Sequence, residues 1–207
     1  MIKYRIIMDS PLIAVSPSPK QTKGVLAMNS LEEKQIKREI IFEGKVLNVV
    51  RDTVTLPNGN EATREVCLHI GAVCIIPLLE DGCILMERQY RYPHERVFLE
   101  IPAGKLNYIG EDPLEAAKRE LREETGAIAR KYTDLGDMIP SPAILGEKIR
   151  MYLAEDITFT NRKLDDDEFI EVEKIPLKDL YDMVMSGKIG DAKTQITVLK
   201  VWNLIHS

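Results

Sequence analysis

Residues 112–126, DPLEAAKRELREETG, carry the clearest structural signal in the sequence. Asp112 is a favourable helix N-cap residue, Pro113 suits the first helical position, and Glu115 has the spacing of a capping box. Gly126 stands where a left-handed residue commonly ends a helix. Three apolar residues recur at helical spacing and form the predicted buried stripe: Leu114, Ala117 and Leu121.

The last turns of this helix carry a dense group of carboxylates. Glu120 is three and four residues from Glu123 and Glu124, so the three side chains share one face, about 6 Å apart. A solvated acidic face is the ordinary interpretation, but anions are unfavourable at the C-terminal end of a helix dipole. The glycine turn predicted in EIPAGKL, residues 100–106, also leads directly to this face. A divalent cation such as Mg²⁺ or Mn²⁺ would offset the repulsion between the carboxylates and their unfavourable place at the helix end, because hard cations prefer oxygen ligands.

Strands are predicted before the helix. The stretches with strand-like patterns are residues 45–56, 61–70, 71–79, 83–90 and 98–104. The Asn-Gly pair in PNGN, residues 57–60, predicts a hairpin between the first two stretches. Residues 80–82, Glu-Asp-Gly, predict a second hairpin between the next two. The fifth stretch is expected to end in a tight turn at Gly104.

Strands and then helices are predicted after residue 126. Strands are expected around residues 134–139 and 148–154, and the acidic stretch 165–176 leads from a loop into another strand. Two amphipathic helices follow, at residues 177–187 and 192–205, and Asp191 caps the second. This order of elements predicts an α+β fold in which sheets are layered with helices.

Composition excludes several classes of protein. Hydrophobic residues make up 44% of the 207 residues, enough for a sizeable core, and the formal net charge of -5 disfavours binding to nucleic acid or anionic membranes. The three cysteines form no CxxC pair, which indicates reduced thiols in a cytoplasmic protein. The longest apolar stretch, residues 71–79, is too short to span a bilayer, and the N-terminus lacks a secretory signal.

The helix and the turn before it resemble the signature of the Nudix hydrolases. That signature runs Gly, five residues, Glu, seven residues, Arg-Glu, an aliphatic residue, any residue, Glu-Glu, any residue, Gly and an aliphatic residue. The chain has Gly104, Glu111 and RELREETGA, residues 119–127, and every spacing from Glu111 to Gly126 agrees. It departs in having six residues between Gly104 and Glu111, and alanine at the final aliphatic position. The resemblance implies a Nudix-like α+β sandwich of mixed β-sheet and helices, preceded by an antiparallel strand region.

The resemblance also implies roles for individual residues. Glu120, Glu124 and the backbone carbonyl of Ala103 are expected to bind Mg²⁺, for which Mn²⁺ can substitute. Glu123 is expected to act in catalysis as a ligand or just behind the ligands, and Arg119 to orient a glutamate. For Glu111 and Glu115, helix capping and complementarity to the helix dipole are equally good explanations.

Four further features resemble the ADP-ribose pyrophosphatase branch of this family, over residues 39–205. RQYR, residues 88–91, precedes LEIPAGKL; Pro142 lies sixteen residues beyond Gly126; and Glu147 lies five beyond Pro142. The fourth feature is GKIGDAKT, residues 187–194. The branch more often has Ser-Pro-Gly where this chain has Ser-Pro-Ala. The implied reaction is hydrolysis of ADP-ribose, a nucleoside diphosphate, to AMP and ribose 5-phosphate.

The branch implies a substrate site and a homodimer. Arg91, and more weakly Arg51, are expected to neutralise the pyrophosphate. Glu100 is expected to contact the adenine-side ribose, or alternatively to pair with an arginine. Glu147 is expected to be a general base on a mobile loop, exposed to solvent until substrate binds. A hairpin at about residues 40–70 is expected to cross to a partner subunit, where Arg51 reaches the neighbour's site.

The predicted organisation therefore has three parts. Residues 1–27 form a poorly ordered extension, residues 28–70 a strand region that can serve in dimerisation, and residues 71–207 the Nudix domain. Other interpretations stay open: a Nudix enzyme for another nucleotide sugar or dinucleotide, a non-catalytic sensor of ADP-ribose, and a purely structural acidic helix. Sensors of this kind usually lack the signature glutamates, whereas this helix keeps all of its own.

Overall fold

A computed structural model describes residues 31–164 and 168–207, so the predicted extension at residues 1–27 lies outside the described residues. The elements in order are β1 Lys34–Glu43, β2 Asn48–Thr55, β3 Glu61–Leu68, β4 Ala72–Pro77, β5 Cys83–Arg91, the short 3-10 helix η1 Tyr92–His94, β6 Arg96–Glu100, β7 Ala103–Lys105, α1 Pro113–Thr125, β8 Ala127–Met138, β9 Ile149–Phe159, β10 Ile170–Pro176, α2 Leu177–Met185 and α3 Ala192–His206. No helix in this part of the chain is long and apolar enough to cross a membrane.

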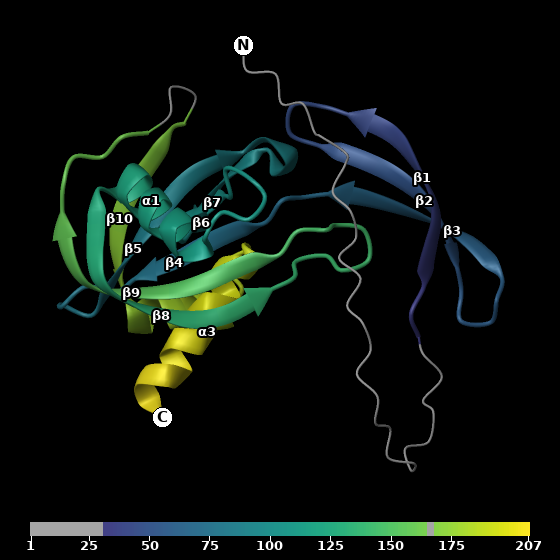
Figure 1. Ribbon diagram of the computed structural model, residues 1–207. Helices are drawn as coiled ribbons and strands as arrows, with labels where there is room; N and C mark the ends of the chain where they lie inside the picture. The colour runs from purple at the N-terminus through teal and green to yellow at the C-terminus, as the bar shows by residue number, and fades with distance from the viewer. Residues whose placement is uncertain (1–30, 165–167) are drawn as a thin grey trace, which may run out of the picture.

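The main body is a sandwich of sheets and helices (Figure 1). One sheet has the strand order β7-β4-β9-β8, in which β4 and β9 run parallel, and another has the order β10-β5-β6. Alternate β4 residues point to opposite sides, as the period of a strand requires. Cys74 and Ile76 pack in a cluster with residues of α2 and α3, whereas Val73 and Ile75 pack with α1. The predicted α+β layering is confirmed.

The second predicted hairpin is wrong in its pairing, although the turn is present. The chain turns at Gly82, whose amide donates to Leu79 O at 3.0 Å. Beyond a single bridge between Leu78 and Ile84, the two strands separate into different sheets. Every residue of β4 is buried, and a strand that is apolar on both faces suits a central position between non-local partners. Local pattern alone does not identify those partners.

The stretch at residues 98–104 also differs from expectation, since it holds parts of two strands. β6 pairs with β5, the strand is interrupted at Pro102, and β7 then pairs with β4 in the other sheet. Gly104 lies within β7, not in a tight turn. Proline lacks an amide hydrogen, so it suits the point at which a strand leaves its ladder. Strands β8 and β9 are each longer than the sequence pattern predicted.

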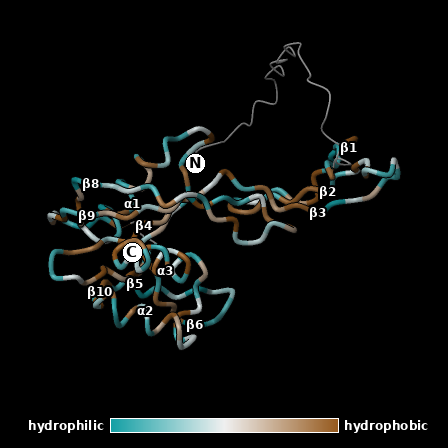
Figure 2. The backbone as a smooth tube through the Cα atoms, turned by 90° about the horizontal axis from the view of Figure 1, so that it is seen from below, coloured by the Kyte–Doolittle hydropathy of each residue, from teal (hydrophilic) through white to brown (hydrophobic). Residues whose placement is uncertain are grey.

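The N-terminal strands form a separate antiparallel sheet, β1-β2-β3, beside the main body (Figures 1 and 2). The predicted hairpin between β2 and β3 is confirmed, with Gly59 in the left-handed region at φ 87°. β1 begins at Lys34, earlier than the expected strand pattern, and all ten of its residues are exposed. Arg38 fastens β1 to β2 through two hydrogen bonds to Asp52, of 2.8 and 2.6 Å.

Candidate active site

Helix α1 begins and ends as its sequence predicts. Asp112 Oδ1 accepts a hydrogen bond from Leu114 N at 2.9 Å. At the other end, Gly126 adopts φ 74° and its amide donates to Arg122 O, which ends the helix. Glu115 extends along the exposed face to Lys118 Nζ, 2.7 Å away. The helix is therefore fixed at both ends, and its last two turns have a defined orientation against β7.

Glu120 lies directly over the backbone of Gly104. A Cβ atom placed on this glycine would be 2.1 Å from Glu120 Cδ, far inside van der Waals contact. Gly104 has no left-handed backbone conformation, so its lack of a side chain is required by close approach alone. This explains why the signature has glycine here: the strand must admit the carboxylate of the helix.

Arg119 forms ion pairs with the glutamates that surround it. Its Nη1 lies 2.6 Å from Glu120 Oε1 and 3.5 Å from Glu123 Oε2. Its Nη2 lies 3.6 Å from Glu111 Oε1 and donates to Lys105 O at 3.2 Å. One guanidinium thus offsets the repulsion between three carboxylates. The structure brings the predicted Arg119, Glu120 and Glu123 together.

Glu124 is the most buried glutamate of the helix, with 4% of its surface exposed. Ala103 N donates to Glu124 Oε2 at 3.0 Å, which places this predicted pair side by side. Burial is the main cause that raises the pKa of Glu124, and the charges of Glu87 and Glu120 raise it further. A carboxylate held in this way gains a large benefit from any nearby cation.

Glu87 on β5 is a buried carboxylate that the sequence analysis did not identify. It is 3% exposed, and its Oε1 has no hydrogen-bond partner within the described residues. Burial raises the pKa of Glu87, although the charge of Lys193 acts in the opposite direction. The available signal was weak: Glu87 shares a strand face with the buried Leu85, but a glutamate on a strand is usually solvated.

Arg91 is held by a chain of charged groups. Glu100 accepts two hydrogen bonds from Arg91, of 2.9 and 2.7 Å, and a third from Lys193 Nζ at 2.5 Å. Lys193 also lies 3.0 Å from Asp191, the N-cap residue of α3. Burial acts to raise the pKa of Glu100, but the bond from Arg91 and the charge of Lys193 outweigh it and hold that pKa below its usual value. Sequence reasoning did not single out Lys193.

Glu147 lies in the loop before β9 and contacts a histidine. Its Oε1 is 3.5 Å from His69 Nε2, and Gly71 N donates to His69 Nδ1 at 3.1 Å, which leaves the ring proton on Nε2, facing Glu147. Glu147 is partly buried, so the expected exposure to solvent is wrong. The cause is that two backbone hydrogen bonds hold the loop against β3: Cys67 N donates to Ile144 O, and Gly146 N donates to Cys67 O. Within the described residues, Glu147 pairs with His69 and not with a residue of α1.

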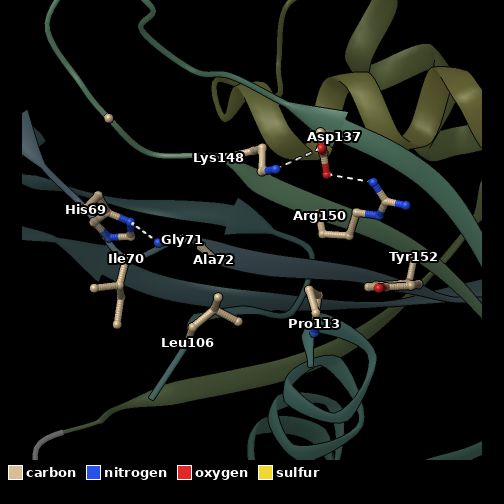
Figure 3. A pocket seen from close by; sticks show the side chains of 11 residues that line it. His69, Ile70, Gly71, Ala72, Leu106, Pro113, Asp137, Lys148, Arg150 and Tyr152 are labelled. Atoms are coloured by element: carbon tan, nitrogen blue, oxygen red, sulfur yellow. Dashed lines mark hydrogen bonds and ion pairs between the residues drawn. The ribbon is translucent and has the colours of Figure 1, made fainter. Parts of the chain in front are cut away.

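A pocket of about 370 Å³ lies beside this loop (Figure 3). Lys148 and Arg150 both point toward Asp137, at 3.3 and 2.9 Å. Leu106 and Pro113 line another part of the wall. The pocket therefore connects the Glu147 loop with the segment that leads into α1.

Arg51 is the one predicted substrate-binding residue that lies away from these groups. It is exposed on β2 and pairs with Glu65 across the N-terminal sheet at 3.2 Å. That sheet and α1 lie on different sides of the molecule in Figure 1. Within one chain, the structure does not bring Arg51 to the acidic helix.

The donor atoms fit a hard divalent cation. The carboxylates of Glu87 on β5 and of Glu120 on α1 lie close enough to Glu124 for their charges to interact, and hard cations prefer such oxygen donors. Across residues 31–164 and 168–207, no three acidic, histidine or cysteine side chains already stand in a ready-made cage. Glu120 is drawn to Arg119, and Glu124 to the amide of Ala103. Binding an ion therefore requires these carboxylates to exchange partners.

Comparisons with known proteins agree with this geometry. The model of the NUDIX domain matches residues 68–194, and that of the nucleoside diphosphate sugar hydrolase N-terminal domain matches residues 33–67. The chain is 43% identical over 173 residues to an ADP-ribose pyrophosphatase of Bacillus subtilis (strain 168), which covers 83% of this chain and 93% of that protein. It is 40% identical over 169 residues to a methanol dehydrogenase activator of Bacillus methanolicus, covering 81% and 91% of the two chains. An ADP-ribose pyrophosphatase of Mycobacterium tuberculosis is 34% identical over 168 residues, covering 80% and 81%.

A solved structure confirms the fold. A crystal structure of an ADP compounds hydrolase superposes with a TM-score of 0.76 at 23% sequence identity, over 86% of this chain and 96% of that one. The matched models divide the chain at residues 67 and 68, where β3 ends and the link to β4 begins. With a matching domain over more than half of its length and close relatives along most of it, the chain belongs to the NUDIX family.

Proposed function

We propose that the chain hydrolyses the pyrophosphate bond of ADP-ribose to give AMP and ribose 5-phosphate, with Mg²⁺ as the cation and Mn²⁺ as a substitute. The observation that carries this proposal is the convergence of Glu120 and Glu124 on β7, with Arg91 close enough to Glu124 for their charges to interact. Two relatives named ADP-ribose pyrophosphatase, at 43% and 34% identity, favour ADP-ribose as the substrate.

The metal-binding groups in this proposal are the carboxylates of Glu120 and Glu124 and the backbone carbonyl of Ala103. A divalent ion held there supplies charge neutralisation of the pyrophosphate and lowers the pKa of a bound water. Arg119 contacts Glu120 at 2.6 Å and holds its carboxylate over Gly104, beside the proposed ion site. Glu123, at 3.5 Å from the same guanidinium, assists from the edge of the site.

Arg91 binds the pyrophosphate in this proposal. A guanidinium matches the geometry of phosphate oxygens, and the anchor from Glu100 leaves part of the Arg91 side chain exposed for that contact. Glu100 is 4% exposed, and it accepts hydrogen bonds from Arg91 and Lys193. It therefore contributes to substrate binding by holding Arg91 in place.

Glu147 accepts the proton of the attacking water. For this the loop must carry Glu147 away from His69 toward the pyrophosphate, since its ion pair in the structure is with that histidine. Water then adds to one phosphorus, the bond from that phosphorus to the bridging oxygen breaks, and the leaving phosphate retains the electron pair.

We also propose a homodimer that forms through the N-terminal sheet. Six apolar residues of β1 and the following turn are exposed: Ile36, Ile40, Ile41, Phe42, Val46 and Leu47. Exposed apolar groups of this extent commonly mark an interface. Such an interface would let Arg51 reach the active site of the partner. Three free thiols further favour a cytoplasmic location.

A product assay tests the function. Purified protein is incubated with ADP-ribose, with and without Mg²⁺, and products are separated by chromatography, with GDP-mannose and NADH in parallel. AMP and ribose 5-phosphate are expected only with the metal, and fastest from ADP-ribose. Faster turnover of GDP-mannose or NADH would support another Nudix specificity. Binding of ADP-ribose without turnover would instead support the sensor interpretation.

A further inference from the structure

Glu87 has an unusual environment for a carboxylate. It lies on β5, which is flanked by β10 and β6, and is 3% exposed. Its Oε1 is buried without a hydrogen-bond partner in the described chain. Burying such a group costs free energy unless a partner compensates, and native structures rarely leave one without a reason.

The neighbouring cations do not supply that partner. The strand register places Glu87 opposite Glu100. The positive groups there are committed to Glu100, which accepts hydrogen bonds from Arg91 and Lys193. They attract Glu87 through space but leave its Oε1 without a bond. Structural ion pairing therefore explains Glu100 and does not explain Glu87.

Glu87 lies on the same face of β5 as Leu85, which belongs to the buried cluster that contains Ala117 and Leu121 of α1. Of the charged neighbours of Glu124, Glu87 is the one that most disfavours its ionised form. Glu124 has one oxygen occupied by the amide of Ala103. Two buried carboxylates, one from a strand and one from a helix, thus repel each other. A cation between them would turn that repulsion into attraction for both.

We propose that Glu87 is a further ligand, directly or through one water, of the divalent cation held by Glu124. The ion then joins β5 to α1, so that two separate parts of the fold are linked by the metal. This proposal rests on the proposed function, because it concerns the same cation. Glu87 lies outside the signature that spans residues 104–127, and so it would be a ligand particular to this site.

Binding of Mn²⁺ to the metal-free protein tests this ligand role without relying on turnover. Free Mn²⁺ is counted by electron paramagnetic resonance during titration, and thermal unfolding is followed with and without Mn²⁺. Glu87→Gln keeps the shape and removes the charge, and we expect about tenfold or greater loss of Mn²⁺ affinity with a smaller Mn²⁺-induced rise in Tm. Glu171→Gln, an exposed residue of the adjacent β10, is the matched control and should bind as the unaltered protein does.

Glu120→Gln serves as the reference for the proposed metal site. If Glu120→Gln weakens Mn²⁺ binding and Glu87→Gln does not, the ligand role of Glu87 is overturned and the proposed function stands. If neither variant weakens binding, the metal site itself is overturned. Should Glu87→Gln fail to fold, Glu87→Leu removes the buried carboxylate altogether and must show the same loss of Mn²⁺ affinity, or the proposal fails.

Discussion

The carboxylate of Glu120 occupies the space that a side chain at residue 104 would fill. A Cβ on Gly104 would come within 2.1 to 2.5 Å of three Glu120 atoms, all at the far end of that side chain. The Glu120 side chain can therefore take this position only because residue 104 is glycine. This contact fixes where the glutamate stands relative to the strand, and it makes residue 104 a sensitive position for catalysis.

Gly104→Ala should therefore impair catalysis more than folding. The clashing atoms belong to a flexible side chain, so Glu120 can rotate away, and we expect the Tm to change little. Displacing this proposed metal ligand should raise the Mg²⁺ concentration needed for half-maximal activity by about tenfold or more. Activity against Mg²⁺ concentration and thermal unfolding, measured on the same preparation, test this. Unchanged Mg²⁺ dependence in a folded variant would show that Glu120 does not bind the ion.

Lys193→Met should both destabilise the protein and weaken substrate binding. It leaves Glu100 buried with Arg91 as its remaining cation, so the loss of stability should lie below the ~3–5 kcal/mol of a fully uncompensated buried charge. Arg91 then loses part of its anchor, so KM for ADP-ribose should rise more than kcat falls. Urea unfolding and steady-state kinetics give the two readouts.

Lys178→Met provides the control for that prediction. Lys178 also forms an ion pair, with Asp182 one helical turn away, but both side chains are more than half exposed. Exposed pairs at this spacing contribute about 0.3–0.5 kcal/mol, so stability and KM should barely change. Equal effects of the two substitutions would contradict a special role for the Glu100 carboxylate.

Glu147→Gln and His69→Ala should have different kinetic effects. A glutamine cannot accept the proton of the attacking water, so Glu147→Gln should lower kcat by about 10²–10⁴-fold while Mn²⁺ affinity stays the same. His69→Ala removes the side-chain contact of Glu147 and leaves the backbone bonds of the loop to Cys67 in place, so the base is kept and can move more freely. Its kcat should change far less. If the two variants lose activity equally, the histidine takes part in the chemistry itself.

The metal-free protein should become less stable as pH rises. The pKa of Glu124 is raised above its ordinary 4.5 in the folded state, chiefly by burial, so the folded protein binds more protons than the unfolded chain. The stability that Glu124 contributes is fully present below about pH 4.5 and is lost as the pH rises toward the raised pKa of this group. Unfolding in denaturant at several pH values, with a chelator, measures this slope.

Glu124→Gln and added Mg²⁺ should each flatten that dependence. The amide does not ionise, and a bound cation favours the charged carboxylate, so either change removes part of the proton uptake on folding. A metal-free Glu124→Gln variant with the same slope as the unaltered protein would assign the pH dependence to other groups.

Local sequence determined α1 almost completely. Its caps at Asp112 and Gly126 act within a few residues, and the shared face of Glu120 and Glu124 follows from helical spacing alone. The fold class was predicted for the same reason, because the periodicity of each element is local. Roles proposed for single residues of this helix thus depended little on the tertiary structure.

Non-local packing explains what the sequence did not reveal. β4 and β5 read as a hairpin, but each pairs with strands far along the chain. Glu87 became notable only because the folded chain buries it, and His69 because a later loop places Glu147 beside it. Such contacts between distant segments leave no periodic trace in the sequence.

The most direct test is a crystal structure of the protein with Mg²⁺ and a non-hydrolysable analogue of ADP-ribose. We expect at least one ion bound to the carboxylates of Glu120 and Glu124, with phosphate oxygens of the analogue completing its coordination and Arg91 contacting the diphosphate. A structure in which the analogue binds elsewhere, or in which Glu120 stays with Arg119 and no ion stands between α1 and the diphosphate, would contradict a metal-dependent pyrophosphatase site on this helix.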